Sequence, residues 1–266
     1  MSKEKIILLI LIFFVIVLVR YIYIQTKFAR ENKVSLESDK IKGEIRITQI
    51  SDFHSNKLRN LDYLLEKIKI FKPHFIILTG DINDYGETKK FNKAVFLLDK
   101  ISSLGINTIY ITGNHEESGR MTEEFIKEVK KRNIYFLHNS GIVYETSENR
   151  IYFYGTGFYD FSYENFNPID NGLNIVLCHN SKMIREQKDG REDFVFSGHT
   201  HGGQVRLPII GALFAPGEGF LPKYSKGIYN YNNTVFYIDS GLGNTKFDLR
   251  FLNQIQFSNI TIKECQ

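Results

Sequence analysis

Cysteine and proline are scarce in this chain of 266 residues, which contains two cysteines and five prolines. Cys178 and Cys265 are too few for a disulfide scaffold or a cysteine-built zinc site. The few prolines and the 20 glycines leave no room for a long low-complexity linker. The sequence also has no internal repeat, P-loop or Ser-His-Asp pattern. Shares of 42% hydrophobic and 24% charged residues exclude a disordered chain, a collagen and a coiled coil, so we expect a sizeable core.

Positive charge exceeds negative charge mainly near the N-terminus. Residues 1–40 hold seven Lys or Arg against four Asp or Glu, a balance of +3; the whole chain carries +4, which leaves +1 for residues 41–266. A nucleic-acid-binding protein normally carries its basic excess on the folded part. Here the excess flanks an apolar segment, where lipid headgroups are the natural partner. We therefore expect a membrane contact and no nucleic-acid partner.

A long apolar run occupies the N-terminus. Ile6 to Val19 are fourteen unbroken apolar residues, and Tyr21 to Ile24 extend the run beyond Arg20. A helix of about nineteen residues spans roughly 28 Å, close to the thickness of the bilayer core. No small-residue cleavage site follows, which favours an uncleaved anchor over residues 1–24 rather than a signal peptide. Residues 25–43 are polar, lack a core pattern and are expected to form a tether.

From Glu44 the sequence alternates short apolar runs with amphipathic segments. Periodicity predicts strands near 45–50, 75–78 and 108–111, separated by helices that include 61–68, 91–101 and part of 119–132. After Ile134 strands dominate, at 142–146, 150–155, 173–178, 193–197, 204–209, 228–232, 234–239 and 251–262. This order predicts an α/β fold with mixed sheets, formed by one domain over residues 44–266.

Five apolar strands of this domain run directly into polar residues. The five junctions read Ser51-Asp52-Phe53-His54, Gly80-Asp81-Ile82-Asn83-Asp84, Gly113-Asn114-His115-Glu116, Cys178-His179 and Gly198-His199-Thr200-His201. Because the carboxyl ends of strands in open α/β sheets form the ligand crevice, we expect these side chains to meet. Five of the seven histidines lie at these junctions; His74 and His138 do not, and are expected to be ordinary surface or core residues.

The side chains at the five junctions are typical of a metal centre. Oxygen and imidazole ligands without thiolate favour Mn, Fe, Zn or Ni over a structural zinc. One ion cannot take all seven candidates, whereas two ions that share a carboxylate can. Asp81 lies between the two ligand groups in chain order and is the natural bridge. The seven are Asp52, His54, Asp81, Asn114, His179, His199 and His201.

The motifs D-x-H, GD-x-x-D, GNH-[ED], H and GH-x-H, in this order, resemble those of the calcineurin-like metallophosphoesterase superfamily. The resemblance covers roughly residues 44–266 and implies a four-layer αββα sandwich with a dinuclear site. It implies that Asp52, His54 and His201 bind one metal, that Asn114, His179 and His199 bind the other, and that Asp81 bridges them. His115 would then stabilise the substrate phosphate or protonate the leaving oxygen, and Asp84 would support His115 or a ligand.

Three later stretches narrow the resemblance. Gly202 to Pro208, Lys223 to Tyr229 and Gly241 to Gly243 look like the bacterial YkuE/YaeI-type phosphoesterases, which are typically membrane-associated. That group and the related UDP-2,3-diacylglucosamine hydrolases imply phospholipid or nucleotide-lipid phosphate esters as substrates. The family habit implies an extracytoplasmic domain. The basic residues after the apolar run outnumber those before it, and by the positive-inside rule they point to the cytoplasm.

Two departures bear on the substrate. Protein phosphatases of the superfamily usually carry phosphate-clamping arginines where this chain has Tyr85 and Thr112, so a protein phosphatase is disfavoured. Asn180-Ser181-Lys182 follows His179 where the subgroup usually has a nearby Pro-Asp pair, which affects substrate preference more than metal binding.

The sequence as a whole predicts a phosphoesterase. The resemblance implies hydrolysis of phosphodiester or pyrophosphate bonds by a water or hydroxide that bridges two metal ions. A phosphomonoesterase or nucleotidase is an alternative, because the metal core is shared and the pocket loops decide. A non-catalytic, membrane-tethered metal-binding protein is a further alternative. The complete ligand set together with His115 disfavours it, since a pseudoenzyme usually loses a ligand.

Overall fold

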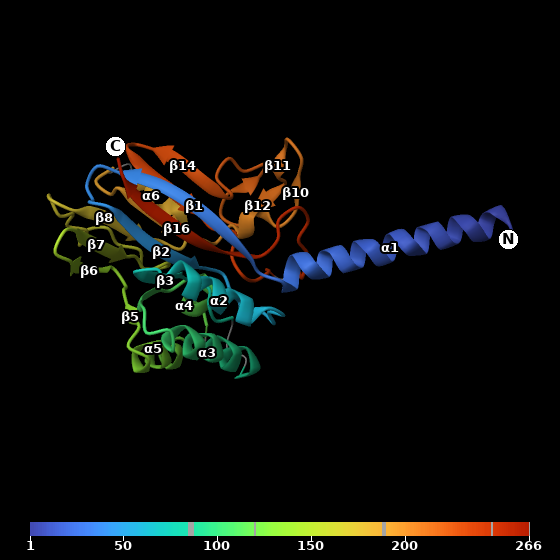
Figure 1. Cartoon of the computed structure of the whole chain (residues 1–266), viewed down its shortest axis with the longest axis horizontal. Coiled ribbons are helices and arrows are strands. Elements are labelled where there is room, and N and C mark those ends of the chain that lie inside the picture. The colour runs from blue at the N-terminus through green and yellow to red at the C-terminus, as the bar shows by residue number, and fades with distance from the viewer. Residues whose placement is uncertain (85–87, 120, 188–189, 246, 266) are drawn as a thin grey trace.

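Two six-stranded sheets stack face to face in the computed structural model, which describes residues 1–84, 88–119, 121–187, 190–245 and 247–265 (Figure 1). The first sheet has the order β1 (Arg30–Ser38), β16 (Gln256–Glu264), β2 (Glu44–Ile50), β3 (Phe75–Thr79), β4 (Asn107–Ile111) and β5 (Tyr135–Phe136). The second has the order β14 (Gly227–Tyr231), β15 (Thr234–Ile238), β9 (Phe194–Ser197), β8 (Leu173–Leu177), β7 (Arg150–Gly155) and β6 (Ser140–Glu145).

Helices cover both outer faces of this pair of sheets. On the first sheet, side chains from α2 (Leu61–Phe71), α3 (Thr88–Ser102) and α5 (Thr122–Lys131) pack with Ile76 and Leu78 of β3. On the second sheet, Ile184 of α6 (Ser181–Gln187) packs with Val176 and Val195. Between the sheets, alternate residues such as Ile77 face the inner strands of the other sheet. The expected four-layer sandwich is confirmed.

Parallel pairing brings the polar junctions to one edge of the sandwich. β2, β3 and β4 are parallel neighbours in the first sheet, and β8 and β9 are parallel neighbours in the second. Their carboxyl ends therefore lie together, as the general rule for ligand crevices requires. Short elements complete this edge, namely α4 (Asn114–Glu117), the 3₁₀ turn η1 (His201–Gly203), β10 (Arg206–Leu207), β11 (Gly211–Ala212), β12 (Phe214–Ala215) and β13 (Gly219–Phe220).

The N-terminal helix α1 (Lys3–Lys27) projects from the body of the molecule (Figure 1). It has a window of mean hydropathy 3.0, none of which is buried, and it is long and apolar enough to cross a membrane. Only its last turns touch the domain, where Gln25 and Thr26 are buried. The apolar part of α1 has therefore no protein partner in the part of the chain that the structure describes.

The expected tether over residues 25–43 is wrong for most of its length. Residues 25–27 complete α1, and β1 is an edge strand that pairs in parallel with β16 over nine residues. Val34 and Leu36 point into the core between the sheets, and Ile41 is also buried there. Three alternate residues of β1 point inward, but only Val34 and Leu36 are apolar, because the third is Ser38. Two apolar residues are too few to predict a strand from the sequence.

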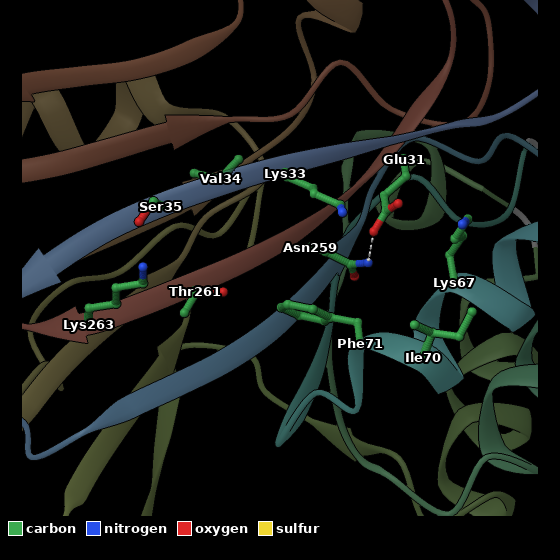
Figure 2. A pocket seen from close by; sticks show the side chains of 10 residues that line it. All are labelled: Glu31, Lys33, Val34, Ser35, Lys67, Ile70, Phe71, Asn259, Thr261 and Lys263. Carbon is green, nitrogen blue, oxygen red and sulfur yellow. Dashed lines mark hydrogen bonds between the residues drawn. The ribbon is translucent and has the colours of Figure 1, made fainter.

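A groove on the outer face of the first sheet also involves β1. It has a volume of about 460 Å³ and lies over β1 and β16 beside α2, where Figure 2 shows Lys33, Lys67 and Lys263 around it. Glu31 at its rim accepts a hydrogen bond from Asn259 at 2.8 Å. Residues 30–38 thus form both a sheet edge and a surface wall, and belong to the folded body.

Two expected strands are shorter than the pattern predicted. The segment 204–209 contains only the two residues of β10, because Gln204 turns the chain with a φ of 42°. The segment 251–262 becomes a strand only at Gln256, because the preceding residues hydrogen-bond to the end of α1: the amides of Leu252 and Asn253 donate to Tyr21 and Gln25. Both differences come from contacts between segments far apart in the sequence.

Candidate metal centre

The nine side chains that the sequence singled out all belong to the loops at the strand ends. Asp52 and His54 follow β2, Asp81 and Asp84 follow β3, Asn114 and His115 follow β4, His179 follows β8, and His199 and His201 follow β9. Eight of them fall into groups whose ligand atoms lie within 4.8 Å of one another or are joined by a direct contact. The groups are Asp52 with His54 and His201, His54 with Asp81 and His115, and Asp81 with His179 and His199.

Asp81 connects these groups. Its Oδ2 atom lies 3.5 Å from His54 Nε2, 3.2 Å from His179 Nε2 and 4.0 Å from His115 Nε2. The carboxylate of Asp81 therefore faces imidazoles of both expected ligand groups, His54 from one and His179 from the other. Burial would raise the pKa of Asp81, but the charges of the surrounding histidines and the bond with His179 outweigh it and hold this pKa well below its usual range.

A second convergence forms around Asp52. His201 Nε2 lies 3.6 Å from Asp52 Oδ1 and 3.1 Å from His54 Nε2. All three side chains are buried. Two imidazoles beside a buried carboxylate are a usual ligand set for a divalent cation. The arrangement therefore fits a metal ion.

Single atoms of His179 and Asn114 also indicate a bound metal. His179 Nδ1 donates to the carbonyl of Thr79 at 2.7 Å, which fixes the tautomer and turns Nε2 towards Asp81. That Nε2 atom is buried and contacts Asp81 Oδ2 at 3.2 Å, and Oδ1 of Asn114 is buried without a hydrogen-bond partner among the described residues. Orphaned buried atoms of this kind are rare in folded proteins and call for an unseen partner, which a metal ion would be.

The protonation states favour cation binding. Burial lowers the pKa of His54 to about 4 and that of His199 to about 3, so both are neutral imidazoles, the form that ligates metals. Burial would also lower the pKa of His179, but the carboxylates of Asp81 and Asp52 and the Thr79 carbonyl raise it to about 10. His179 thus holds positive charge at the place where a bound cation would supply it.

The backbone at the centre is strained. The φ angles of Asp52, His54, Asp81, His199 and His201 are 48°, 46°, 52°, 69° and 49°. Non-glycine residues rarely adopt this left-handed region, at a cost of about 1–3 kcal/mol each, and such strain is concentrated at functional sites. The left-handed turns bring Asp52, His54 and His201 within 4.8 Å of one another and place His199 beside Asp81 and His179.

Two glycines make room for this arrangement. A side chain at Gly113 would overlap the carboxylate of Asp81, and one at Gly198 would overlap Ser51 and the carboxylate of Asp52. The glycines in the GNH and GH-x-H motifs are therefore required by close approach, since the junction after β4 packs against the one after β3, and the junction after β9 against the one after β2.

His115 is partly exposed and has two carboxylates beside it. Its Nδ1 atom is 2.8 Å from Asp84 Oδ1, and its backbone N–H donates to Asp81 Oδ1 at 2.9 Å. Lys90 in turn forms an ion pair with Asp84 at 2.8 Å. Burial opposes protonation of His115, but the bond with Asp84 and the nearby acidic charges raise its pKa above the usual value. His115 is thus suited to carry a proton near neutral pH.

Two supporting residues were missed by the sequence reasoning. The buried carboxylate of Glu116 accepts hydrogen bonds from the backbone N–H groups of Asp81, Asn83 and Gly113 at 2.8–2.9 Å, and so ties two junctions together. Its place in the GNHE motif was a signal. Arg250 is fully buried, donates to the carbonyls of Ser240 and Gly243, and lies 3.4 Å from His201 Nδ1. No local pattern marks Arg250.

The remaining predicted positions lie outside this centre. His74 is exposed and accepts from the backbone N–H of Arg46. His138 is partly exposed and pairs with Asp160 at 2.7 Å, near Glu117. Tyr85, which replaces a phosphate-clamping arginine, lies outside the described residues. The structure therefore brings five of the seven histidines together at the strand ends and leaves His74 and His138 apart from them.

Known proteins resemble this chain over most of its length. The sequence profile of the calcineurin-like phosphoesterase family matches residues 45–203. The metallophosphoesterase YkuE of Bacillus subtilis is 29% identical over 82% of this chain and 79% of its own. YkoQ, a metallophosphoesterase of the same organism, is 27% identical over 85% and 87%. Phosphodiesterase YaeI of Escherichia coli is 28% identical over 74% and 75%. The family match includes all five strand-end junctions.

Proposed function

Because this chain belongs to the calcineurin-like phosphoesterase family and is therefore a hydrolase of phosphate esters, we propose that it cleaves phosphodiester or pyrophosphate bonds with two divalent metal ions. The observation that carries this proposal is the position of Asp81. Its Oδ2 atom lies within 3.2–4.0 Å of imidazole nitrogens from three different strand ends. A carboxylate in this place can be shared by two cations.

We assign Asp52, His54 and His201 to one cation, Asn114, His179 and His199 to the other, and Asp81 to both. The donor set contains no thiolate, which favours Mn, Fe, Zn or Ni. When bound, two such ions would lower the pKa of a water molecule and neutralise the charge of the phosphate. Glu116 holds two ligand loops in place by accepting hydrogen bonds from their backbone N–H groups, and Arg250 lies against the ring of His201.

His115 is proposed to protonate the leaving oxygen. Its side chain is partly exposed, and its ring nitrogen Nε2 lies 4.0 Å from Asp81 Oδ2, beside the proposed position of the phosphate. The raised pKa of His115 favours the protonated form, and the carboxylate of Asp84 orients the ring. The positive charge also favours the negatively charged phosphate as its bond to the leaving group breaks.

The cavity beside His54 and Asp84 favours a lipid-linked substrate. It has a volume of about 320 Å³ and is lined by four lysines, Lys27, Lys57, Lys90 and Lys93, against two aspartates, Asp84 and Asp248, so positive charge is in excess. Lys27 is the last residue of α1. An adjoining apolar pocket of about 420 Å³ is lined by Phe53, Leu58, Leu61, Phe96 and Leu97. Asn56, Lys57 and Lys93 line both. A phosphate ester bound in the basic cavity would thus place an apolar chain in the adjoining apolar pocket.

We further propose that α1 anchors the protein in a membrane, with the domain on the extracytoplasmic side. Cys265 can report on which side of the membrane the domain lies, because its thiol is exposed whereas that of Cys178 is buried. A membrane-impermeant maleimide should label intact cells that produce the full chain, and the Cys265→Ser variant should remain unlabelled. Labelling only after the cells are permeabilised would place the domain in the cytoplasm.

The proposed activity is tested with the full chain in detergent. We expect Mn²⁺-dependent hydrolysis of bis-p-nitrophenyl phosphate that a chelator abolishes and that His115→Ala reduces about 10²- to 10⁴-fold. His74→Ala, a change of an exposed histidine outside the centre, is the matched control and should keep full activity. Faster cleavage of p-nitrophenyl phosphate would indicate a phosphomonoesterase. Bound metal without hydrolysis of either ester would indicate a non-catalytic metal-binding protein.

A further inference from the structure

Large apolar side chains are exposed on two loops next to the base of α1. One loop spans residues 205–221, where the exposed fractions of Ile209, Phe220 and Leu221 are 108%, 84% and 66%. The other spans residues 247–252, where those of Phe247 and Leu252 are 70% and 49%. Scattered single apolar residues on a surface need no explanation, but a group of them on joined loops marks an interaction site.

The two loops are joined to each other and to α1. Val205 forms a β-bridge with Phe251, and the backbone N–H of Arg206 donates to the carbonyl of Phe251 at 3.0 Å. The ring of Phe251 packs edge-on against Tyr21 of α1, with the ring centres 5.5 Å apart, and the N–H of Leu252 donates to the Tyr21 hydroxyl. Figure 1 shows β10, β11 and β12, which lie in the first loop, on the side of the body from which α1 emerges.

The outward position of these side chains is built into the backbone. Ile209, Leu221 and Leu252 have φ angles of 70°, 46° and 49°. A left-handed conformation is rare for leucine and is an outlier for a β-branched residue such as isoleucine. The strained residues are among the most exposed apolar ones, so burial against the body does not explain the strain. Strain of this kind is concentrated at functional sites, which makes these loops candidates for an interaction surface.

We propose that the loops 205–221 and 247–252 insert into the surface of the same bilayer that α1 spans. The proposal rests on the membrane anchor of the proposed function but not on catalysis. Tyr21 and Tyr23, near the end of the apolar run, are residue types that favour the headgroup level. The loops bonded to Tyr21 therefore lie at that level, where apolar side chains enter the boundary of the acyl chains.

This docking has a consequence for the catalytic cavity. Two residues that line that cavity are next to these loops or to α1. Lys27 is the last residue of α1, and Asn244 shortly precedes the second loop. Lys27 also pairs with Asp248 of the second loop at 2.7 Å. With both loops in the bilayer surface, the cavity opens beside the headgroups, and its lysines face anionic phosphate. The enzyme would then take phosphate esters of lipids directly from the plane of the membrane.

The test uses the absence of tryptophan from the chain. Phe220→Trp and Ile209→Trp each introduce a single tryptophan, and Val143→Trp, at an exposed site on β6, is the matched control. The full chain of each variant is reconstituted in vesicles with and without brominated phosphatidylcholine. We expect bromine to reduce the emission of the two loop variants at least twofold and to leave that of the control nearly unchanged.

The result does not depend on enzymatic activity. Strong quenching in a protein without phosphoesterase activity would support the docking and overturn the proposed function. Equal, weak quenching in all three variants would overturn the docking. A change in the emission of Phe220→Trp that depends on protein concentration, again without quenching, would also overturn it and would assign the loops to contact with a second copy of the chain. Circular dichroism of each variant checks that the fold is kept.

Discussion

At the scale of single residues, the pair formed by His115 and Asp84 controls the proton that the reaction needs. The carboxylate raises the pKa of His115, and the imidazole can donate a proton only below that pKa. Activity should therefore fall as the pH rises through it. In Asp84→Asn the charge is lost and the pKa of His115 falls, so the alkaline limb of the pH–rate profile should move to lower pH. Loss of such a supporting carboxylate commonly costs about 10- to 100-fold in activity.

The control for this prediction is Asp62→Asn, which removes an exposed carboxylate on α2. Its profile should match that of the unchanged protein. An alkaline limb that stays in place in Asp84→Asn would contradict the role given to His115, even if the maximal rate fell.

Arg250 is a buried cation that contacts the proposed metal ligand His201 on the ring nitrogen Nδ1, away from the metal site. Its guanidinium donates to the carbonyls of Ser240 and Gly243 and lies against His201. In Arg250→Met at least two buried carbonyls lose their donor, at about 1–3 kcal/mol each. We expect the free energy of unfolding to fall by roughly 2–6 kcal/mol, as measured by denaturant titration. Arg150→Met, at an exposed ion pair with Glu145, should change it by less than about 1 kcal/mol.

At the scale of elements, β1 turns the expected tether into part of the core. Leu36 has an exposed fraction of 5% and packs between the sheets. Leu36→Ala should lower the free energy of unfolding by about 2–5 kcal/mol, the usual cost of such a truncation in a core. The exposed neighbour Glu37→Ala should change it by no more than about 0.5 kcal/mol. Equal, small effects of both changes would mean that residues 30–38 are not held in the sheet.

The strand-end junctions could be predicted from the sequence because both of their signals are local. An apolar strand such as Ile76 to Thr79 has a strong pattern, and Asp81 follows within two residues. β1 could not be predicted because its partner strand is distant, and Arg250 could not because no local pattern marks its burial against Ser240, Gly243 and His201. Val34 of β1 pairs with Ile260, and Leu252 meets Tyr21 across 231 residues. Contacts of that range leave no periodic trace in either segment.

At the scale of the whole molecule, α1 and the catalytic cavity belong to one end of the body, since Lys27 and His54 line the same cavity. The adjoining apolar pocket should matter only for substrates with an apolar chain. Phe96→Ser removes part of its wall, so the KM for a lipid-linked diester should rise roughly 5- to 30-fold, from about 1–2 kcal/mol of lost apolar contact. Hydrolysis of bis-p-nitrophenyl phosphate should not change. Tyr63→Ser, at an exposed aromatic residue of α2, is the control.

Metal content measured together with activity tests the central claim most directly. The full chain, saturated with Mn²⁺ and freed of unbound ions, should hold two ions per chain by elemental analysis and hydrolyse bis-p-nitrophenyl phosphate. Asp81→Asn removes the carboxylate that faces both groups of histidines. It should hold fewer than two ions and lose activity by at least 10²-fold, while His74→Ala keeps both. Two ions and full activity in Asp81→Asn would contradict the account.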